Sequence, residues 1–374
     1  MLFKSRKQRM QIKFIDKDRD RNLFYATLRQ RVDAYFKEHK ISKFHNRQMV
    51  LKTIILLSAY SVPFAYMLLF KPSTGISTGL WTIMGFALAG IGMSVMHDAN
   101  HGAYSKSSRV NYWLGHTLNL LGGSVFNWKL QHNILHHTYT NIVHLDDDID
   151  DKLVMRFSPH TNVKWYHRFQ VVYAFLFYGI LTLYWALLKD FVQFSTYTKE
   201  GVNTSTKQQN RRILLKIILS KLVYFSIFIF IPVFVPGIPA GVCIGGFLLM
   251  HFIAGLVLTV IFQLAHTVEG TSHPVPDETG LIENNWAIHQ LNTTVNFSRK
   301  NKWISWYVGG LNFQVEHHLF PTICHVHYPN LAPIVKLTAT EFGIPYLENK
   351  TFGVALRSHI STLRRFGLRD VEIG

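Results

Sequence analysis

Five long apolar runs constrain this 374-residue chain more than any other feature. A helix needs about 20 consecutive apolar residues to cross the hydrocarbon core of a bilayer. Hydrophobic residues make up 48% of the chain and charged residues only 16%, and the apolar residues gather into the runs. The sequence therefore predicts an all-α integral membrane protein instead of a water-soluble globule. The runs are residues 49–70, 76–96, 171–188, 213–235 and 241–264.

The distribution of charge predicts which side of the membrane the loops face. The formal net charge is +17, and residues 1–48 are basic and contain no apolar stretch typical of a signal peptide. The turn 235–241 has no charge. Because basic segments stay in the cytoplasm, we expect both termini there and the short turns outside. A nucleic-acid partner is not expected, since this apolar chain has little room for a basic groove.

Histidine groups occur before residue 138 and after residue 316. If both groups lie on the same side of the membrane, the chain between them must cross it an even number of times. Three runs lie between the groups, so one of the three does not cross. The run 171–188 is the shortest, and its Tyr and Trp residues are typical of a membrane interface. We expect an interfacial helix there, and four transmembrane helices in two hairpins beneath a cytoplasmic helical cap. The expected divisions are residues 1–48, 49–346 and 347–374.

One amphipathic helix is expected before the first run. Between Arg21 and Ile41, apolar side chains recur on one helical face with basic residues interleaved. This pattern fits a helix lying in the membrane interface. It fits equally well a helix packed on the cytoplasmic cap, and both alternatives stay open.

Three groups of histidines dominate the polar chemistry of the chain. Imidazoles four residues apart lie on one helical face and can converge on one metal. A single such pair is weak support for a metal site, but three groups placed beside the runs predict one shared polynuclear site. The groups are His97 with His101, His132 with His136 and His137, and His317 with His318.

The type of ligand limits the metal. Seven imidazoles are too many for one tetrahedral zinc site, which takes about four ligands, so two metals fit better. Iron, zinc, copper and nickel all bind imidazole. The only cysteines, Cys243 and Cys324, are too far apart in sequence to indicate a disulfide framework or a thiolate zinc site. Two irons could use O2 to remove hydrogen from an unactivated C–H bond, which no side chain can do.

The three groups resemble, in order, the histidine boxes of membrane fatty acid desaturases. The phrases His97-Asp98-Ala99-Asn100-His101-Gly102 and Glu316-His317-His318-Leu319-Phe320-Pro321 carry the resemblance, which spans about residues 49–346. It implies a di-iron enzyme that inserts a cis double bond into a long-chain acyl group of an acyl-CoA or acyl-lipid. The reaction takes O2 and two electrons from an external donor. The resemblance also implies that His266 is an eighth imidazole ligand and that Gln314 binds metal directly or through water.

Gln314 resembles the glutamine of the front-end subgroup, the linoleoyl-CoA delta-6 and delta-5 types. Those enzymes often carry a fused cytochrome b5 domain with a His-Pro-Gly-Gly motif, and no such motif occurs here. The resemblance therefore implies a separate donor of the ferredoxin or cytochrome b5 type, which the basic cytoplasmic surface could guide.

Further side chains near the boxes are candidates for supporting roles. Asp98 and Glu316 are candidates to orient the metal-binding imidazoles. The run 146–151 could do the same for some imidazoles, but solvated loop charge is the expected role for most of it. His325 and His327 are not expected to bind metal. Trp286, Gln290 and Thr294 recur at helical spacing and either line an acyl channel or simply pack.

Other functions remain as alternatives. A lipid hydroxylase or ketolase on the same di-iron scaffold would carry nearly the same boxes. A histidine-rich metal transporter would need polar residues at mid-span, where only His251 occurs. A bis-histidine haem carrier would need histidines on facing membrane helices.

Overall fold

The computed structural model describes residues 12–149 and 154–368, and they are mostly helical. The α-helices are α1 (Phe24–Glu38), α2 (Arg47–Phe70), α3 (Thr74–Gly90), α4 (Met96–Asn100), α5 (Ser108–Gly115), α6 (Val125–Trp128), α7 (His137–Tyr139), α8 (Gln170–Tyr184), α9 (Asp190–Lys199), α10 (Lys207–Phe225), α11 (Ile231–Phe234), α12 (Ala240–His266), α13 (Trp286–Thr293), α14 (Lys302–Tyr307), α15 (Gln314–Leu319), α16 (Tyr328–Glu341) and α17 (Phe352–Gly367).

Shorter 3-10 or π-helical turns join several of these helices. They are η1 (Arg21–Leu23), η2 (Ile91–Val95), η3 (His116–Leu121), η4 (Lys129–His136), η5 (Trp165–Phe169), η6 (Trp185–Lys189), η7 (Ser226–Phe230) and η8 (His325–His327). Two pairs of two-residue parallel strands also occur, β1 (Lys13–Phe14) with β2 (Leu281–Ile282), and β3 (Asn296–Phe297) with β4 (Glu348–Asn349).

Five helical stretches of the described chain are long and apolar enough to cross a membrane, judged by length and composition. Four of them contain or nearly match the runs expected to span. Their ends follow local chemistry: the Asn46 side chain accepts a hydrogen bond from the backbone N–H of Met49 at the start of α2. Thr206 and Gln209 form a capping box that starts α10. The five stretches are Arg47–Phe70, Thr74–Asn100, Trp165–Lys199, Lys207–Phe234 and Ala240–His266.

The stretch Trp165–Lys199 is longer than expected. The run 171–188 was judged the shortest of the five, but it lies within the longest stretch, 35 residues. Its position at the membrane interface remains a prediction. The helix continues because its polar residues beyond 188 are accommodated by the protein interior. Both of its ends contact segments of the cap: the Gln170 amide donates to the carbonyl of Leu363 at 2.6 Å, and the Tyr197 hydroxyl donates to Asp147. The four-span count remains a prediction.

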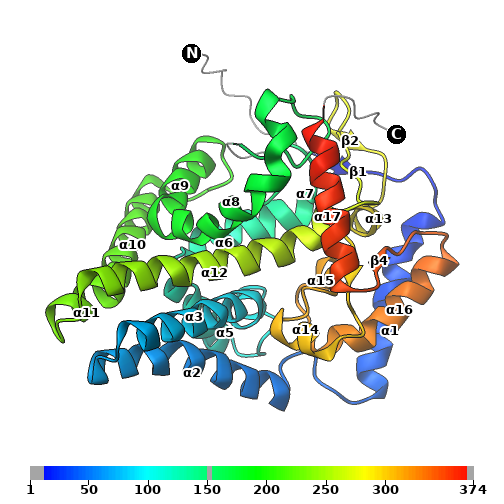
Figure 1. The fold of residues 1–374 in the computed structure, drawn as a ribbon. Helices are drawn as coiled ribbons and strands as arrows, with labels where there is room; N and C mark the ends of the chain where they lie inside the picture. The colour runs from blue at the N-terminus through cyan, green and yellow to red at the C-terminus, as the bar shows by residue number, and fades with distance from the viewer. Residues whose placement is uncertain (1–11, 150–153, 369–374) are drawn as a thin grey trace.

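Helix α12 lies at the centre of the apolar part, packed between α3 and α8 (Figure 1). Glycines permit this close packing. A methyl group at Gly255 would lie 2.6 Å from the carbonyl oxygen of Gly179 on α8. One at Gly85 on α3 would lie 2.9 Å from the carbonyl oxygen of Met250. Helices α3, α8 and α12 thereby approach one another closely.

Helices α1 and α13 to α17 form a cap at the C-terminal end of α12, opposite α11 (Figure 1). Helix α1 packs on α16 and buries Phe24, Leu28, Val32 and Phe36 there. The apolar face of the N-terminal amphipathic helix is thus occupied by the cap, which is the second of the two alternatives above. At the other end of the chain, α17 packs on α8 and η5.

Candidate metal centre

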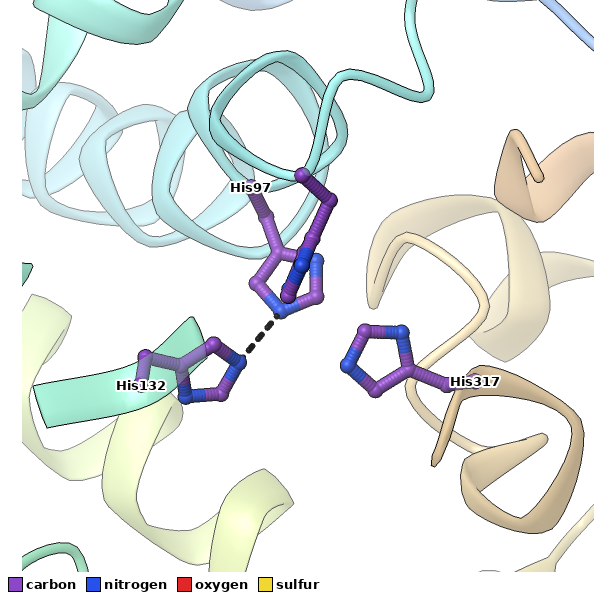
Figure 2. A group of neighbouring side chains, drawn as sticks. His97, His132 and His317 are labelled. Carbon is purple, nitrogen blue, oxygen red and sulfur yellow. Dashed lines mark hydrogen bonds between the residues drawn. The ribbon is translucent and has the colours of Figure 1, made fainter. Parts of the chain in front are cut away.

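The eight imidazoles expected to bind metal come from four separate segments and meet in one buried cluster. His97 lies in α4 and His101 directly follows this helix, at the end of the second apolar stretch, and His266 is the last residue of α12. The others lie in η4, α7 and α15. Figure 2 shows His97, His132 and His317 pointing toward a common centre from three of these segments. The η4 and α15 members are His132, His136, His317 and His318, and His137 begins α7.

A local distortion of the helix aims the middle group. The residues Lys129–His136 form a π-helical turn instead of an ordinary α-helix. Such wide turns occur mainly at functional sites, where they change the direction of successive side chains. Here the turn allows His132, His136 and His137 all to face the cluster, with ring centroids 4.9 Å apart for His132 and His137.

The cluster divides into two subsets of side chains whose ligand atoms lie within 4.8 Å of one another. The ring of His137 lies between the subsets, with its centroid 4.8 Å from that of His101 and 4.5 Å from that of His318. This arrangement has room for two metals, with His137 next to both. The first subset is His97, His101, His132 and His317, and the second is His136, His266 and His318.

The residues fit a pair of transition-metal ions. Buried ring nitrogens without any hydrogen-bond partner occur on His101, His136, His137, His266, His317 and His318. A buried polar atom left unpaired is costly, and a metal would satisfy it. The Nε2 atoms of His97 and His132 lie 3.1 Å apart. Two nitrogens bound to one ion at about 2.1 Å lie at about this separation.

Partners on the outer side of the rings fix four of the imidazoles. Nδ1 of His132 lies 3.1 Å from Asp148, and Nδ1 of His136 lies 2.9 Å from Asp146. Nδ1 of His318 lies 2.7 Å from the side-chain oxygen of Gln290, and Nδ1 of His317 lies 3.3 Å from the hydroxyl of Tyr328. In each ring a proton on Nδ1 leaves the lone pair of Nε2 free to bind a metal. Metal-binding histidines use this arrangement.

Burial keeps most of these imidazoles neutral. It lowers the pKa of His101, His137, His317 and His318 well below the usual value, and neighbouring histidines lower it further. His136 differs: burial alone would lower its pKa, but the Asp146 carboxylate raises it above the usual value. A neutral ring is the form that binds a metal.

The aspartate run corrects a second expectation. Solvated loop charge was expected for most of residues 146–151, yet Asp146 is buried against His136 and Asp148 hydrogen-bonds His132. Asp147 accepts from Tyr197. Burial would raise the pKa of Asp148, but the hydrogen bond with His132 and the nearby imidazoles hold it below the usual range. Asp150 and Asp151 lie outside the described residues. The loop folds back on η4, which local sequence does not reveal.

Asp98 and Glu316 do not contact the imidazoles of the cluster through any described hydrogen bond. Oδ2 of Asp98 accepts from Nδ1 of His325 at 2.8 Å, and Nε2 of that ring lies 2.7 Å from Nζ of Lys52. Glu316 accepts from the amide of Asn296 and the hydroxyl of Tyr346, each at 2.8 Å, and burial raises its pKa to about 7. Asp98 therefore ties its box segment to η8, and Glu316 ties its own to β3 and to the loop at Tyr346.

The three residues expected near an acyl channel lie on or directly after α13, beside the cluster. Gln290 orients His318, and the hydroxyl of Thr294 donates to the backbone carbonyl of Gln290 at 2.6 Å. Nε1 of Trp286 donates to the backbone carbonyl of His137 at 3.1 Å. Gln290 and Thr294 are fully buried and hold the metal-site helices together.

Gln314 lies beside the second subset, because its amide nitrogen is 2.9 Å from Nε2 of His266. The side-chain amide therefore has access to the same space as the three imidazoles of that subset. His251, the only mid-span histidine of the apolar runs, is not part of the cluster. Its two ring nitrogens lie 2.8 Å from the hydroxyl of Tyr224 and 3.1 Å from that of Thr182.

The sequence of this chain is similar to those of known proteins. A family profile described as fatty acid desaturase matches residues 74–350. The sn-1 linoleoyl-lipid 6-desaturase of Arthrospira platensis is 36% identical over 351 residues, which cover 92% of this chain and 93% of the relative. The acyl-lipid (8-3)-desaturase of Physcomitrium patens is 35% identical, covering 95% of this chain and 74% of the relative. A probable delta(5) fatty acid desaturase of Dictyostelium discoideum is 31% identical, covering 95% and 77%.

Proposed function

This chain belongs to the fatty acid desaturase family, and from that premise we propose that it is an O2-dependent, di-iron acyl-lipid desaturase of the front-end type. The observation that supports this most directly is the buried set of eight imidazoles, six of which carry ring nitrogens without a hydrogen-bond partner. The proposed ligands are His97, His101, His132, His136, His137, His266, His317 and His318, with Gln314 as a further ligand, direct or through water.

The proposed reaction removes two hydrogens from adjacent methylenes of an acyl chain. With O2, two protons and two electrons from outside, it gives one double bond and two waters. Two irons would supply the O2-based oxidation that no side chain can perform.

The residues of the chain prepare the site for this chemistry. Asp146, Asp148, Gln290 and Tyr328 hold four rings in fixed orientations, so that little reorganisation is needed during turnover. Burial of seven of the eight imidazoles limits the access of bulk water, which would otherwise react with oxidising species. Neutral imidazoles leave the ligand nitrogens available near neutral pH.

Two observations support the substrate and the position of the bond. Two of the three relatives named above act, by name, on acyl-lipids or linoleoyl-lipids, so we infer an acyl group esterified to a lipid as the substrate. Gln314, the residue that suggests front-end desaturation, lies beside the proposed ligand His266. The new bond would then form between an existing double bond and the carboxyl end.

We infer four crossings, with both termini and the metal centre in the cytoplasm. Both ends of the 35-residue stretch Trp165–Lys199 contact the cap, at Leu363 and at Asp147. A segment that starts and ends beside the same cap crosses an even number of times or not at all. The basic N-terminal segment favours the cytoplasmic side, where a ferredoxin or cytochrome b5 type donor is available.

Expression in a host that lacks the activity tests the proposal. Mass spectrometry of lipid fatty acids should reveal a new polyunsaturated species when linoleate is present, and iron analysis of the pure protein should give two irons per chain. His136→Ala should abolish the product, whereas His39→Ala, at an exposed position, should not. An unchanged lipid profile with well-expressed protein, or a hydroxylated product, would overturn the proposal.

A further inference from the structure

A surface cavity of about 730 Å³ opens between α1 and α13. Its wall includes two partly exposed aromatic side chains, Tyr25 and Trp286, whose rings meet edge to face with centroids 5.6 Å apart. Arg29, Gln30 and Asp33 of α1 form its polar rim. The cavity is therefore aromatic on one wall and polar elsewhere.

The side chains of Tyr25 and Trp286 donate hydrogen bonds to backbone carbonyls in the segments that carry the histidine cluster. Nε1 of Trp286 donates to the carbonyl of His137, the imidazole between the two subsets, at 3.1 Å. The hydroxyl of Tyr25 donates to the carbonyl of Leu319, the residue after His318, also at 3.1 Å. One side chain and one hydrogen bond thus separate the cavity from a proposed ligand residue.

We infer that the cavity faces water instead of the bilayer. Helices α1 and α13 belong to the cap, at the end of the molecule away from α11 and the apolar stretches (Figure 1). The lining contains polar, charged and aromatic residues, and its only aliphatic side chain is that of Ala26. An acyl chain would have to leave the membrane to enter it, whereas a soluble protein reaches it directly.

The charges of Arg29 and Asp33 in the rim cancel, and Lys43, which pairs with Asp33, adds one positive charge beside the rim. Arg29 is exposed, and the negative charge of Asp33 is compensated by Lys43, whose Nζ lies 2.6 Å from its carboxylate. The whole chain carries a formal charge of +17. Such a surface attracts an acidic partner and raises its association rate at low salt.

We propose that this cavity is the docking and electron-entry site for an acidic one-electron carrier protein, with the indole of Trp286 between the carrier's redox group and His137. The inference rests on the proposed function and adds the partner's binding surface. Each carrier gives up one electron and is oxidised, so two carriers dock per double bond. The two protons that complete the reduction of O2 to two waters come from solvent.

Anaerobic stopped-flow reduction of the iron-loaded enzyme in detergent tests the inference. A reduced acidic [2Fe–2S] ferredoxin is one reductant, and dithionite, which needs no docking surface, is the other. Trp286→Phe keeps a ring against Tyr25 but lacks the N–H that reaches His137. It should slow reduction by ferredoxin at least fivefold relative to reduction by dithionite measured on the same variant.

Arg29→Glu tests docking separately. It should raise the ferredoxin concentration that gives half the maximal rate at least fivefold and weaken the salt dependence. Lys37→Glu makes the same charge change on an exposed position of the same helix outside the cavity, and should have little effect.

Three outcomes would overturn the inference. Ferredoxin kinetics unchanged in both Trp286→Phe and Arg29→Glu would exclude this docking site, while normal reduction by dithionite would leave the proposed function standing. An increased KM for the lipid substrate in Arg29→Glu, with ferredoxin kinetics unchanged, would show that the cavity holds a lipid headgroup instead. Failure of dithionite to reduce the wild-type enzyme would overturn the proposed function itself, and this inference with it.

Discussion

Nδ1 of His136 lies 2.9 Å from Oδ2 of Asp146, and the two side chains are 0% and 1% exposed. The same carboxylate accepts a hydrogen bond from the backbone N–H of Asn141 at 2.9 Å. Because Asp146 is held from two directions, it fixes the tautomer and the plane of the His136 ring and leaves Nε2 facing the cluster without a protein partner.

Asp146→Asn should therefore weaken the metal centre without removing a ligand. Loss of such an outer partner typically reduces metal affinity or activity about 10- to 100-fold. We expect less iron per chain after dialysis against a chelator, and a matching fall in desaturation. Asp277→Asn, in an exposed loop, is the control. Wild-type iron retention and activity in Asp146→Asn would contradict the role assigned to this carboxylate.

Some residues of the site could be predicted from their spacing in the sequence, and others could not. His97, His101, His132 and His136 could be identified because i, i+4 pairs report a shared helix face. Asp146 could not, because its contact with His136 depends on a loop that folds back over η4. A cluster of carboxylates ten residues after a histidine box was the only local signal, and exposed loops produce the same pattern.

Gly255→Ala should separate α8 from α12. The added methyl would lie 2.6 Å and 2.7 Å from the carbonyl oxygens of Gly179 and Tyr178, and backbone atoms cannot rotate away as a side chain can. Overpacking of this kind costs about 1–3 kcal/mol, so we expect a lower thermal unfolding temperature in detergent. Gly245→Ala, on the same helix with no atom within 4 Å of the new methyl, should leave it unchanged. Equal unfolding temperatures for the two variants would show that the helices can move apart freely.

Lys221 on α10 and Asp190 form an ion pair of 2.6 Å whose side chains are 8% and 0% exposed. Removing one partner of a buried pair leaves an uncompensated charge and costs about 3–5 kcal/mol. Lys221→Met should therefore destabilise the protein strongly in thermal unfolding. The double variant Lys221→Met/Asp190→Asn removes both charges and should recover much of the loss. A double variant as unstable as the single one would indicate that the lysine contributes by packing and by its hydrogen bonds to the carbonyls of Gly122 and Trp185, and not by pairing with Asp190.

The length of the helix that contains the run 171–188 also could not be predicted from the sequence. The run 171–188 was judged the shortest from apolar residues alone, but Lys189 and Asp190 continue the helix within the protein interior. Asp190 can be buried because Lys221, from another apolar stretch, neutralises it. Hydropathy along the chain does not reveal a charge paired across helices, so the helix length could not be predicted from sequence.

His359 on α17 joins three elements of the structure. Its Nδ1 lies 2.8 Å from the carbonyl oxygen of Thr267 and its Nε2 lies 3.0 Å from the hydroxyl of Tyr178. The first contact requires a proton on Nδ1, so in the neutral ring Nε2 accepts from the tyrosine. Burial lowers the pKa of His359 to about 4, and a proton on Nε2 would also break the bond from Tyr178.

These properties predict that the folded protein loses stability as the pH falls. The unfolded chain binds a proton at His359 near pH 6.5, but the folded protein does so only near pH 4. The stabilisation is therefore complete above pH 6.5 and is lost as the pH falls from 6.5 to 4, by about 3 kcal/mol at most. His359→Gln, which keeps a donor and an acceptor, should lose less stability than the wild type between pH 7.5 and 4.5 in thermal unfolding. His39→Gln, at an exposed site, should follow the wild type. Parallel pH profiles for His359→Gln and the wild type would mean that this histidine does not titrate differently in the folded and unfolded states.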